Sequence, residues 1–363
     1  MSENKKFLER IQLRIDEFFT SHNRILSSIS DDLTPIGAFS RDFLSGGKRF
    51  RALFCLKGWQ AFHADASAEF CDSVISAASA LEIFHAAALI HDDIIDHSDT
   101  RRGAPSAHRR FETLHRDSQW TGSSSSFGIG AATLLGDLLL MLSDELYNDA
   151  LSEADTDQIR QAARREFNRM RLDVTAGQYL DIVAENAWLQ QDEATHVDYA
   201  RNVIVYKSAK YSIEAPLRIG ASLYGATGAN LDAMSAYGLP LGIAFQLRDD
   251  LLGVFGDSSV TGKPSGDDLR EGKRTMLVSL ARERLTANER GRFDDLLGKA
   301  NLSDEGISTL SEMIIQSGAA DTVEQLIDDN VSQAVTALRD SGINPTVVAE
   351  LHDLAVAVTR RSA

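Results

Sequence analysis

The chain has 363 residues, of which 43% are hydrophobic, so it can bury a large core in one big domain or two smaller ones and is not a disordered protein. Its 37 Lys and Arg against 53 Asp and Glu give a formal net charge of −16, which argues against binding to nucleic acid or to an anionic membrane. An anionic ligand would therefore need a bound cation or a local cluster of basic side chains.

Cys55 and Cys71 are too few for a disulfide framework and match no metal-ligand spacing, so we expect buried free thiols and a reducing, cytoplasmic compartment. The N-terminal residues 1–19 are charged and helical in pattern, without the apolar segment or cleavage site of a secretory signal. The most apolar stretch, residues 74–95, is interrupted by polar side chains and ends in acids. It is expected to be a buried core helix and not a membrane span.

Apolar residues recur three and four apart along almost the whole chain, with six prolines and few alternating β-branched runs, which predicts an all-α protein. Helices are expected near residues 4–29, 33–45, 48–64, 69–96, 106–115, 128–150, 156–186, 192–226, 229–255, 273–286, 288–299, 304–338 and 345–361. No linker separates two parts of the chain, so residues 1–363 are expected to form a single domain.

Two stretches are expected to be loops. Residues 118–128 are rich in Gly and Ser and carry no charge, which is typical of a surface loop between helices. Residues 256–275 combine Gly, Pro, acids and bases. This composition suits a mobile lid over a charged ligand, and a plain exposed connection explains it equally well.

The stretch IHDDIIDHSDTRRG, residues 90–103, carries the first acidic cluster. Residues four apart lie on one face of a helix, so Asp92 and Asp96 present their carboxylates together. Like charges repel there unless a divalent cation lies between them, and Mg²⁺ is bound in this way, with water and phosphate oxygens completing its shell. Arg101 and Arg102 follow, and arginine suits either phosphate binding or structural ion pairs.

The plain alternative is a solvated helix end, but acids are unfavourable at a helix C-terminus because the helix dipole is negative there. Asp93 points away from the face of the other two acids and is expected to support neighbouring structure. We expect His91 to pack or to form a hydrogen bond near the site, because Mg²⁺ prefers oxygen ligands.

A second acidic pair lies in GIAFQLRDDLLGVFGD, residues 242–257, where Asp249 and Asp250 follow Phe245 and Gln246 by about one helical turn. One acidic pair on an apolar helix is weak evidence. Two such pairs, each accompanied by basic residues, indicate facing walls of one metal site.

Basic residues accompany both clusters. GGKRFR, residues 46–51, places Lys48, Arg49 and Arg51 after a glycine pair that ends a helix or makes a turn, which suits an anion-binding nest. Lys207, Lys263 and Lys273 stand alone in the sequence, and a lone lysine is usually a solvated surface residue.

Taken together, GGKRFR, HAAALIHDDIID, RRG, GQYLD (177–181), YKSAKY, FQLRDD and GKPSGDD resemble the trans-isoprenyl diphosphate synthases, or polyprenyl synthetases. They occur in the order found in the family, from about residue 46 to residue 275. Their amino-acid sequences are most similar to those of actinobacterial geranylgeranyl diphosphate synthases. The resemblance implies an isoprenoid-synthase-type helical bundle around a deep central cavity, a homodimer without a membrane anchor, and three Mg²⁺ ions. The implied reaction is head-to-tail condensation of isopentenyl diphosphate with dimethylallyl, geranyl or farnesyl diphosphate.

The resemblance also implies roles for individual residues. The implied metal ligands are Asp92, Asp96 and Asp249. Isopentenyl diphosphate would be held by Lys48, Arg51, His85 and Arg102. The allylic diphosphate would be faced by Arg101, Lys207, Ser208, Gln246 and Lys263. The catalytic set would be Asp92, Asp96, Lys207, Gln246 and Asp249.

The chain departs from the family pattern at two positions. Gly253 stands where many members have a third Asp, which leaves the number of ligands from that helix open. Ser208 stands where Thr is common, and it keeps the hydroxyl.

Helix geometry bears on product length. Ala88, Phe84 and Leu81 lie 4, 8 and 11 residues before Asp92, within one stripe beneath the carboxylates. Ala87 and Ala88 leave the first turn open, and Phe84 is the first bulky side chain, about 12 Å below. This favours a C20 product with C25 as its neighbour, unless Phe84 only packs against another helix.

Two other functions fit part of the pattern. A class I terpene cyclase shares an Asp-rich metal helix, but it has no use for GGKRFR and usually carries an Asn/Ser/Glu second motif in place of FQLRDD. A non-catalytic partner subunit of another synthase could lose its acids, whereas both clusters are intact here. The pattern therefore favours the synthase.

Overall fold

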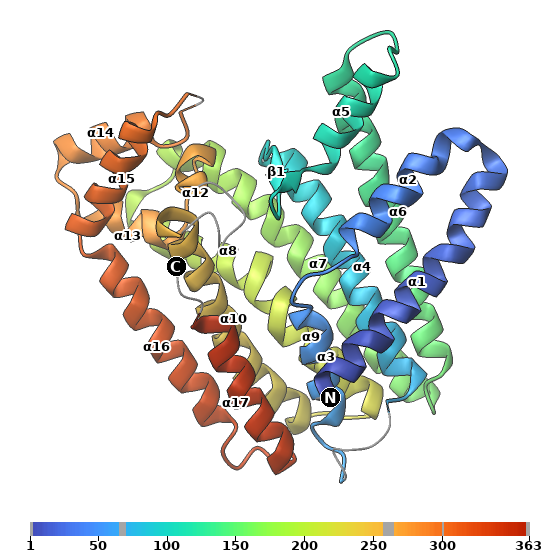
Figure 1. Ribbon diagram of the computed structural model, residues 1–363. Helices are drawn as coiled ribbons and strands as arrows, with labels where there is room; N and C mark the ends of the chain where they lie inside the picture. The colour runs from blue at the N-terminus through green and yellow to red at the C-terminus, as the bar shows by residue number, and fades with distance from the viewer. Residues whose placement is uncertain (1–2, 65–69, 257–264, 300, 361–363) are drawn as a thin grey trace. The chain divides into compact units, whose positions relative to one another are not determined.

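The computed structural model describes residues 3–64, 70–256, 265–299 and 301–360, and this part of the chain is almost entirely helical (Figure 1). The prediction of an all-α protein is confirmed. The chain forms two compact units, unit 1 from Met1–Arg165 and Pro216–Thr227, and unit 2 from Glu166–Ala215 and Gly228–Ala363. The prediction of a single domain stays a prediction.

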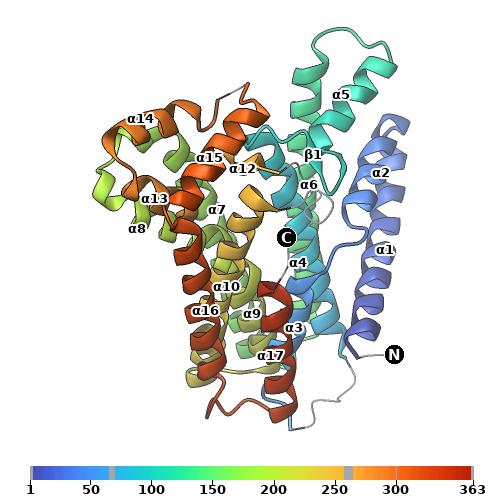
Figure 2. The same ribbon diagram turned by 60° about the vertical axis from the view of Figure 1, so that its left-hand side comes forward.

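The elements of unit 1 are α1 (Glu3–Ile29), η1 (Asp31–Leu33), α2 (Thr34–Phe43), α3 (Phe50–Gln60), α4 (Asp72–Ile95), β1 (Thr100–Arg101), β2 (Ala104–Pro105), α5 (Ala107–Asp117), α6 (Ser124–Ser152) and α9 (Ala215–Tyr224). Helix α7 (Asp157–Ala187) contributes residues to both units. Helices α4 and α6 lie side by side (Figures 1 and 2), and the Ser143 hydroxyl of α6 donates to the carbonyl of Ala80 of α4 at 2.7 Å.

Helix α4 is a buried core helix, as its apolar sequence predicts, and its apolar side chains pack inside unit 1. Helices α4 and α6 are both long and apolar enough to cross a membrane by length and composition alone, which is weak evidence for a span. Most of the apolar window of α4 is buried inside the protein, as in a soluble core helix, whereas only about a third of the α6 window is.

Glycines let α3 and α9 touch backbone to backbone in unit 1. A Cβ placed on Gly58 would lie 2.0 Å from the carbonyl oxygen of Leu217, and one on Gly220 would lie 1.9 Å from that of Cys55. Both distances are far below van der Waals contact, so only glycine fits on either side of this crossing. The crossing explains why residues 216–227 belong to unit 1 although their neighbours in sequence belong to unit 2.

The remaining elements build unit 2: η2 (Trp188–Gln190), η3 (Glu193–Thr195), α8 (His196–Val203), η4 (Ile204–Glu214), α10 (Ala229–Phe255), α12 (Asp267–Glu271), α13 (Met276–Arg284), α14 (Ala287–Leu296), α15 (Asp304–Gln316), α16 (Ala319–Ala337) and α17 (Pro345–Thr359). Helices α10, α16 and α17 pack together (Figures 1 and 2). Tyr237 of α10 donates its hydroxyl to the Leu351 carbonyl of α17 at 2.7 Å, which ties these two helices inside the core.

Several sequence expectations need correction. The helix expected over 192–226 is α8, then η4 as a π-helix, then α9. The loop expected at 118–128 ends earlier, because the Ser123 side chain accepts the Ser126 amide hydrogen and starts α6 at Ser124. Of the two thiols expected to be buried, Cys55 is buried and Cys71 is exposed at the start of α4, and both are free.

Candidate active site

The first acidic cluster lies at the C-terminal end of α4. The amide of Ser98 donates to the carbonyl of Asp93 at 2.9 Å and His97 has φ of 55°, which is the Schellman arrangement that ends a helix. Asp92 therefore lies in the last turn of α4 and Asp96 is its C-cap residue. Two carboxylates face the negative end of the helix dipole there, an arrangement that a bound cation would stabilise.

Asp93 has the supporting role expected of it. Its side chain is fully buried, and Oδ1 accepts a hydrogen bond from Arg101 Nε at 2.8 Å as well as one from Nη2. Arg101 Nη2 also lies 3.6 Å from Asp92 Oδ2. Arg101 therefore bridges two neighbouring acids of α4, and its contact with an allylic diphosphate stays a prediction.

His91 also behaves as expected, since it packs against α6. Its Nε2 lies 3.3 Å from the carbonyl oxygen of Thr133 and 3.4 Å from Asp137 Oδ1. A Cβ on Gly136 would lie 2.3 Å from the same nitrogen, so the glycine makes room for the imidazole.

Arg102 lies in a hairpin that the sequence did not predict. Strands β1 and β2 pair antiparallel, and the two residues between them, Arg102 and Gly103, have φ of 54° and 75°. Positive φ at both positions is the signature of a type I′ turn, which glycine adopts readily and arginine rarely. The turn directs the Arg102 guanidinium toward Gly47, where an added Cβ would lie 3.3 Å from Nη2.

A small pocket in unit 1 gathers basic and polar side chains. It is lined by Phe43, Leu44, Gly46, Arg49, Glu82, His85, Ala86 and Arg102. Gly46 and Gly47, with φ of 74° and 83°, turn the chain between α2 and α3 beside it. Of the residues predicted to hold isopentenyl diphosphate, His85 and Arg102 line this pocket, whereas Lys48 is exposed.

The electrostatics of this pocket set the charge of His85. Burial holds the pKa of His85 well below its ordinary value, and the guanidinium groups of Arg51, Arg102 and Arg101 lower it further, while Asp92 opposes them. The imidazole is therefore neutral near pH 7 and can form hydrogen bonds with a diphosphate without adding charge. Arg51 is close enough to act on His85, although it does not line the pocket.

Glu82 is a pocket residue that the sequence reasoning missed. Its Oε1 accepts the amide hydrogen of Ala52 at 3.1 Å. Burial raises the pKa of Glu82, and Arg51, Arg49 and Arg102 act in the opposite direction. The available signal was an acid in the middle of the apolar stretch 74–95, ten residues before Asp92, where a buried carboxylate needs a partner.

Unit 2 contains a second cluster around Asp181, the last residue of the GQYLD motif. Asp181 Oδ2 accepts hydrogen bonds from Lys207 Nζ at 2.5 Å and from Lys273 Nζ at 3.4 Å. Lys273 Nζ also lies 3.0 Å from Glu185 Oε1. Lys273 is only 9% exposed, so it is not the solvated surface lysine that its isolation in the sequence indicates.

Lys207 and Ser208 lie in the π-helix η4, whose backbone packs directly against glycines of α7 and α10. A Cβ on Gly177 of α7 would lie 2.2 Å from the backbone nitrogen of Lys207. A Cβ on Gly242 of α10 would lie 2.5 Å from the carbonyl oxygen of Ala209. A π-helical segment inside a longer helix often marks a functional site. Gly177 precedes Asp181 by one turn, so the same face of α7 admits the Lys207 backbone and binds its side chain.

Asp250 is the most deeply buried acid of the second motif. It is 4% exposed, its Oδ1 accepts from Gln246 Nε2 at 2.9 Å, and its Oδ2 has no hydrogen-bond partner among the described residues. Burial raises the pKa of Asp250 to about 8, and Asp268, Asp249 and Asp181 contribute in the same direction against the Gln246 hydrogen bond. A buried acid among other acids fits the neighbourhood of a divalent cation, whose charge would stabilise the carboxylate.

Asp268 of α12 occupies the space beside Gly253. A Cβ on Gly253 would lie 2.0 Å from Asp268 Oδ2. Many relatives of the resembled family carry a third Asp at this position of α10, and here a carboxylate from α12 lies there instead. The sequence could not predict this because the two residues lie on different helices.

Replacement of Gly253 by alanine should therefore displace the Asp268 carboxylate. We expect kcat to fall about tenfold, as when one electrostatic group of a site is misplaced. Steady-state kinetics would measure the fall. Gly291→Ala is the matched control, because Gly291 is also helical and has nothing within 4 Å of an added Cβ. Equal activity of the two variants would show that the position of the Asp268 carboxylate does not affect kcat.

The predicted metal ligands are divided between the units, with Asp92 and Asp96 in unit 1 and Asp249 in unit 2. Within the residues that the structure describes, no group of three or more His, Cys, Asp or Glu side chains is close enough to hold a metal ion. Lys263 lies outside the described residues. The shared metal site of Asp92, Asp96 and Asp249 stays a prediction.

An all-α fold with acids at the end of one apolar helix and a second acidic pair on another is that of an isoprenyl synthase, and the comparisons show that the protein is a prenyltransferase. The polyprenyl synthetase family model matches residues 36–314, and the chain belongs to this family. The family prediction made from the motifs is confirmed.

Relatives and solved structures agree with this assignment. The fold is similar to that of geranylgeranyl pyrophosphate synthase from Corynebacterium glutamicum complexed with isoprenyl diphosphate and magnesium, with a TM-score of 0.91, 39% identity and coverage of 98% of this chain and 99% of that one. Geranylfarnesyl diphosphate synthase from Aeropyrum pernix is 32% identical over 77% of this chain and 79% of its own length. Geranylgeranyl diphosphate synthase from Mycobacterium tuberculosis is 29% identical over 84% and 78%.

Proposed function

We propose that this protein condenses isopentenyl diphosphate head-to-tail with dimethylallyl, geranyl or farnesyl diphosphate and releases mainly geranylgeranyl diphosphate. The observation that carries this proposal is the presence of two acid-bearing sites, each set beside basic residues suited to a diphosphate. Two substrates of the same charged class need two such basic settings. The similarity to geranylgeranyl diphosphate synthases supports the C20 product.

The pocket of unit 1 is proposed to hold isopentenyl diphosphate. Arg102 and Arg51 would supply positive charge, and neutral His85 would donate a hydrogen bond. Lys48 is exposed beside the glycine turn and could close onto the diphosphate. No group at this end needs to break a bond, because isopentenyl diphosphate keeps its diphosphate in the product.

The cluster of unit 2 is proposed to bind the allylic diphosphate, which is the leaving group. Lys207 and Lys273 would neutralise charge that develops as the C–O bond breaks, and Gln246 would orient the group through its amide. Ser208, Arg101 and Lys263 complete the proposed allylic set. The apolar walls would exclude water from the allylic cation until the double bond of isopentenyl diphosphate attacks it.

Asp92, Asp96 and Asp249 would hold Mg²⁺, with three ions per site expected from the family resemblance. Carboxylate oxygens are the ligands that Mg²⁺ prefers, and buried Asp250 fits a cation-bound neighbourhood. The ions would supply electrostatic stabilisation of the departing diphosphate. A proton must leave the condensed intermediate in the last step, and the released diphosphate is the proposed base, since no described side chain is a dedicated one.

The carboxyl end of α4 is proposed to open onto the channel for the growing chain. Leu81 and Phe84 are buried one above the other below Asp92, while Ala87 and Ala88 place only small side chains on the turn between. Phe84 would then limit the chain near C20. The similarity to geranylfarnesyl diphosphate synthase supports a C25 product as the second candidate.

Phe84→Ala should lengthen the product from C20 toward C25 or beyond, because it removes the first bulky side chain below the acids. Product chromatography with farnesyl diphosphate as primer would measure chain length. Ile83→Ala is the matched control, because Ile83 is also buried but lies on a different face of α4, about 100° around the helix axis. Unchanged products from the Phe84 variant would show that this ring only packs.

The proposed function is tested with the purified chain, Mg²⁺, isopentenyl diphosphate and each allylic primer offered separately. Elongated prenyl diphosphates are the expected products. Cyclic hydrocarbons formed without isopentenyl diphosphate would instead indicate a terpene cyclase. Activity that appears only after another synthase chain is added would indicate a partner subunit.

A homodimer in the cytoplasm is proposed as the working form. Leu134 and Met141 lie seven residues apart on one face of α6 and are exposed, although this helix is apolar enough to favour burial. A second copy covering this face would bury it and would remove the need for a membrane anchor. The family match runs through both units, which supports one functional domain.

A further inference from the structure

Lys273 and Arg274 lie in a short connection between α12 and α13, and their side chains meet one face of α7 and the turn that follows it. Lys273 Nζ lies 3.0 Å from Glu185 Oε1 and 3.4 Å from Asp181 Oδ2. The Arg274 guanidinium lies over the Trp188 ring, with Cζ 5.1 Å from its centroid. Asp181, Glu185 and Trp188 are spaced four and three residues apart, the spacing of one helical face.

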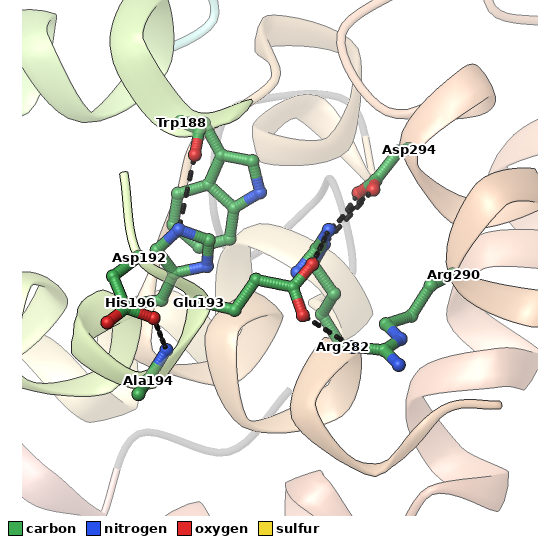
Figure 3. Close-up of polar contacts among 8 residues, drawn as sticks. All are labelled: Trp188, Asp192, Glu193, Ala194, His196, Arg282, Arg290 and Asp294. Atoms are coloured by element: carbon green, nitrogen blue, oxygen red, sulfur yellow. Dashed lines mark hydrogen bonds and ion pairs between the residues drawn. The ribbon is translucent and has the colours of Figure 1, made fainter. Parts of the chain in front are cut away.

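Trp188 is held on several sides (Figure 3). It is 2% exposed, and its ring stacks on His196 with centroids 3.7 Å apart and an interplanar angle of 21°. His196 Nε2 also lies 3.2 Å from the Trp188 carbonyl oxygen. Arg282 Cζ lies 5.8 Å from the centroid of the indole ring. Arg282 Nη2 in turn lies 2.9 Å from Asp294 Oδ2 and 3.0 Å from Glu193 Oε1. The indole is therefore a fixed platform.

The Arg274 guanidinium depends on this platform. Its Nε and Nη1 are buried and have no hydrogen-bond partner among the described residues. The Trp188 ring face lies against this cation, and the more general attraction of the Asp294 and Glu185 carboxylates acts beside it. Fixing Arg274 also fixes the backbone of its neighbour Lys273, because α12 and α13 are joined only by Gly272, Lys273, Arg274 and the N-cap residue Thr275.

Lys273 needs such support. Lysine has a long, flexible side chain that loses considerable rotamer entropy when one geometry is imposed. Its backbone amide donates to the Asp268 carbonyl at 3.0 Å, which fixes the α12 side of the connection. The Arg274 contact with Trp188 fixes the α13 side, so the ammonium group is presented to Asp181 and Glu185 from a connection held at both ends.

We propose that Trp188 is a positioning residue for the allylic diphosphate half of the site: it anchors Arg274 and so aims Lys273 at the acids of α7. The inference rests on the proposed function for the role of this half-site. It adds a residue that lies outside the motifs quoted from the sequence.

The test is a double-mutant cycle on the full chain, with binding of inorganic diphosphate in the presence of Mg²⁺ measured by calorimetry. Trp188→Leu keeps an apolar side chain but removes the aromatic face, and it should weaken binding about tenfold. Trp188→Phe keeps a face and should stay within about threefold of the wild type. In a Lys273→Met background, Trp188→Leu should cause no further loss, because it acts through Lys273.

Arg274→Met provides a second route should the buried indole prove essential for folding. It should reproduce the loss caused by Trp188→Leu, and thermal unfolding of every variant identifies those that are folded. Equal losses from Trp188→Leu with and without Lys273, or a Phe variant as weak as the Leu variant, would overturn the inference. So would wild-type chain that binds no diphosphate with Mg²⁺.

Turnover measurements separate this inference from the proposed function. The Michaelis constant for the allylic substrate should rise in Trp188→Leu while that for isopentenyl diphosphate stays unchanged, a split that general loss of folded protein does not produce. Wild-type chain that binds diphosphate but elongates no primer would refute the proposed function, and the binding cycle would still decide the role of Trp188.

Discussion

Asp92→Asn is expected to lower kcat roughly a thousandfold while the protein stays folded. The amide keeps the size of the side chain but removes the negative charge that would hold Mg²⁺ against the departing diphosphate. The same change relieves repulsion at the C-terminal end of α4 and removes the attraction to Arg101, so the metal-free variant should stay close to the wild type in stability. Steady-state kinetics and denaturant unfolding measure the two effects.

Asp72→Asn is the matched control for this experiment. It makes the same change of charge at the other end of α4, where the Asp72 side chain is 79% exposed. We expect its activity to match the wild type. The variant at Asp92 should also need more Mg²⁺ for half-maximal rate, whereas the control should not. Loss of activity in parallel with loss of folded protein would show that Asp92 is a structural acid.

The sequence predicted what depends on local pattern. Helix α10 was expected over 229–255 and spans Ala229–Phe255, because Gly228 and Gly256 bound a largely apolar stretch of helical spacing. The placement of Asp92 and Asp96 at the end of α4 follows from helical spacing in the same way. Such features need no knowledge of distant parts of the chain.

Features that depend on distant contacts could not be predicted. Lys273 looks like a surface lysine until Asp181, 92 residues earlier, is placed beside it. The π-helix η4 depends on Gly177 and Gly242, which come from two other helices. Glycines in sequence do not reveal which backbone approaches them, so the compressed turn that carries Lys207 appears only in the structure.

The contribution of Asp250 to the stability of the metal-free protein should fall as pH rises from about 4 to about 8. Burial raises the pKa of Asp250 from its ordinary 3.8 to about 8, so in this window the folded protein holds a proton that the unfolded chain has lost. Stability falls wherever the folded state binds more protons, at up to about 1.4 kcal/mol per pH unit for one group. Below this window both states are protonated, and above it the loss is complete.

Asp250→Asn isolates this contribution. Unfolding free energies of wild type and variant, measured in denaturant with the metal chelated, should diverge in favour of the variant as pH rises from about 5 to about 8. Other buried acids with a raised pKa, such as Glu82 and Glu185, are common to both proteins and cancel in the difference. Asp328→Asn, an exposed change on α16, should leave the difference flat.

The same unfolding measurements repeated with Mg²⁺ test whether a cation stabilises the Asp250 carboxylate. A cation beside the acids of α10 favours the ionised carboxylate. Saturating Mg²⁺ should therefore flatten the pH dependence of the wild type's unfolding free energy, and the Asp250→Asn substitution should then raise the unfolding free energy by less. A wild-type curve that runs parallel to that of Asp250→Asn in chelator would mean that Asp250 is ionised without metal. Its carboxylate would then already be stabilised by the protein, and the buried acids of α10 would lose their value as a sign of a cation site.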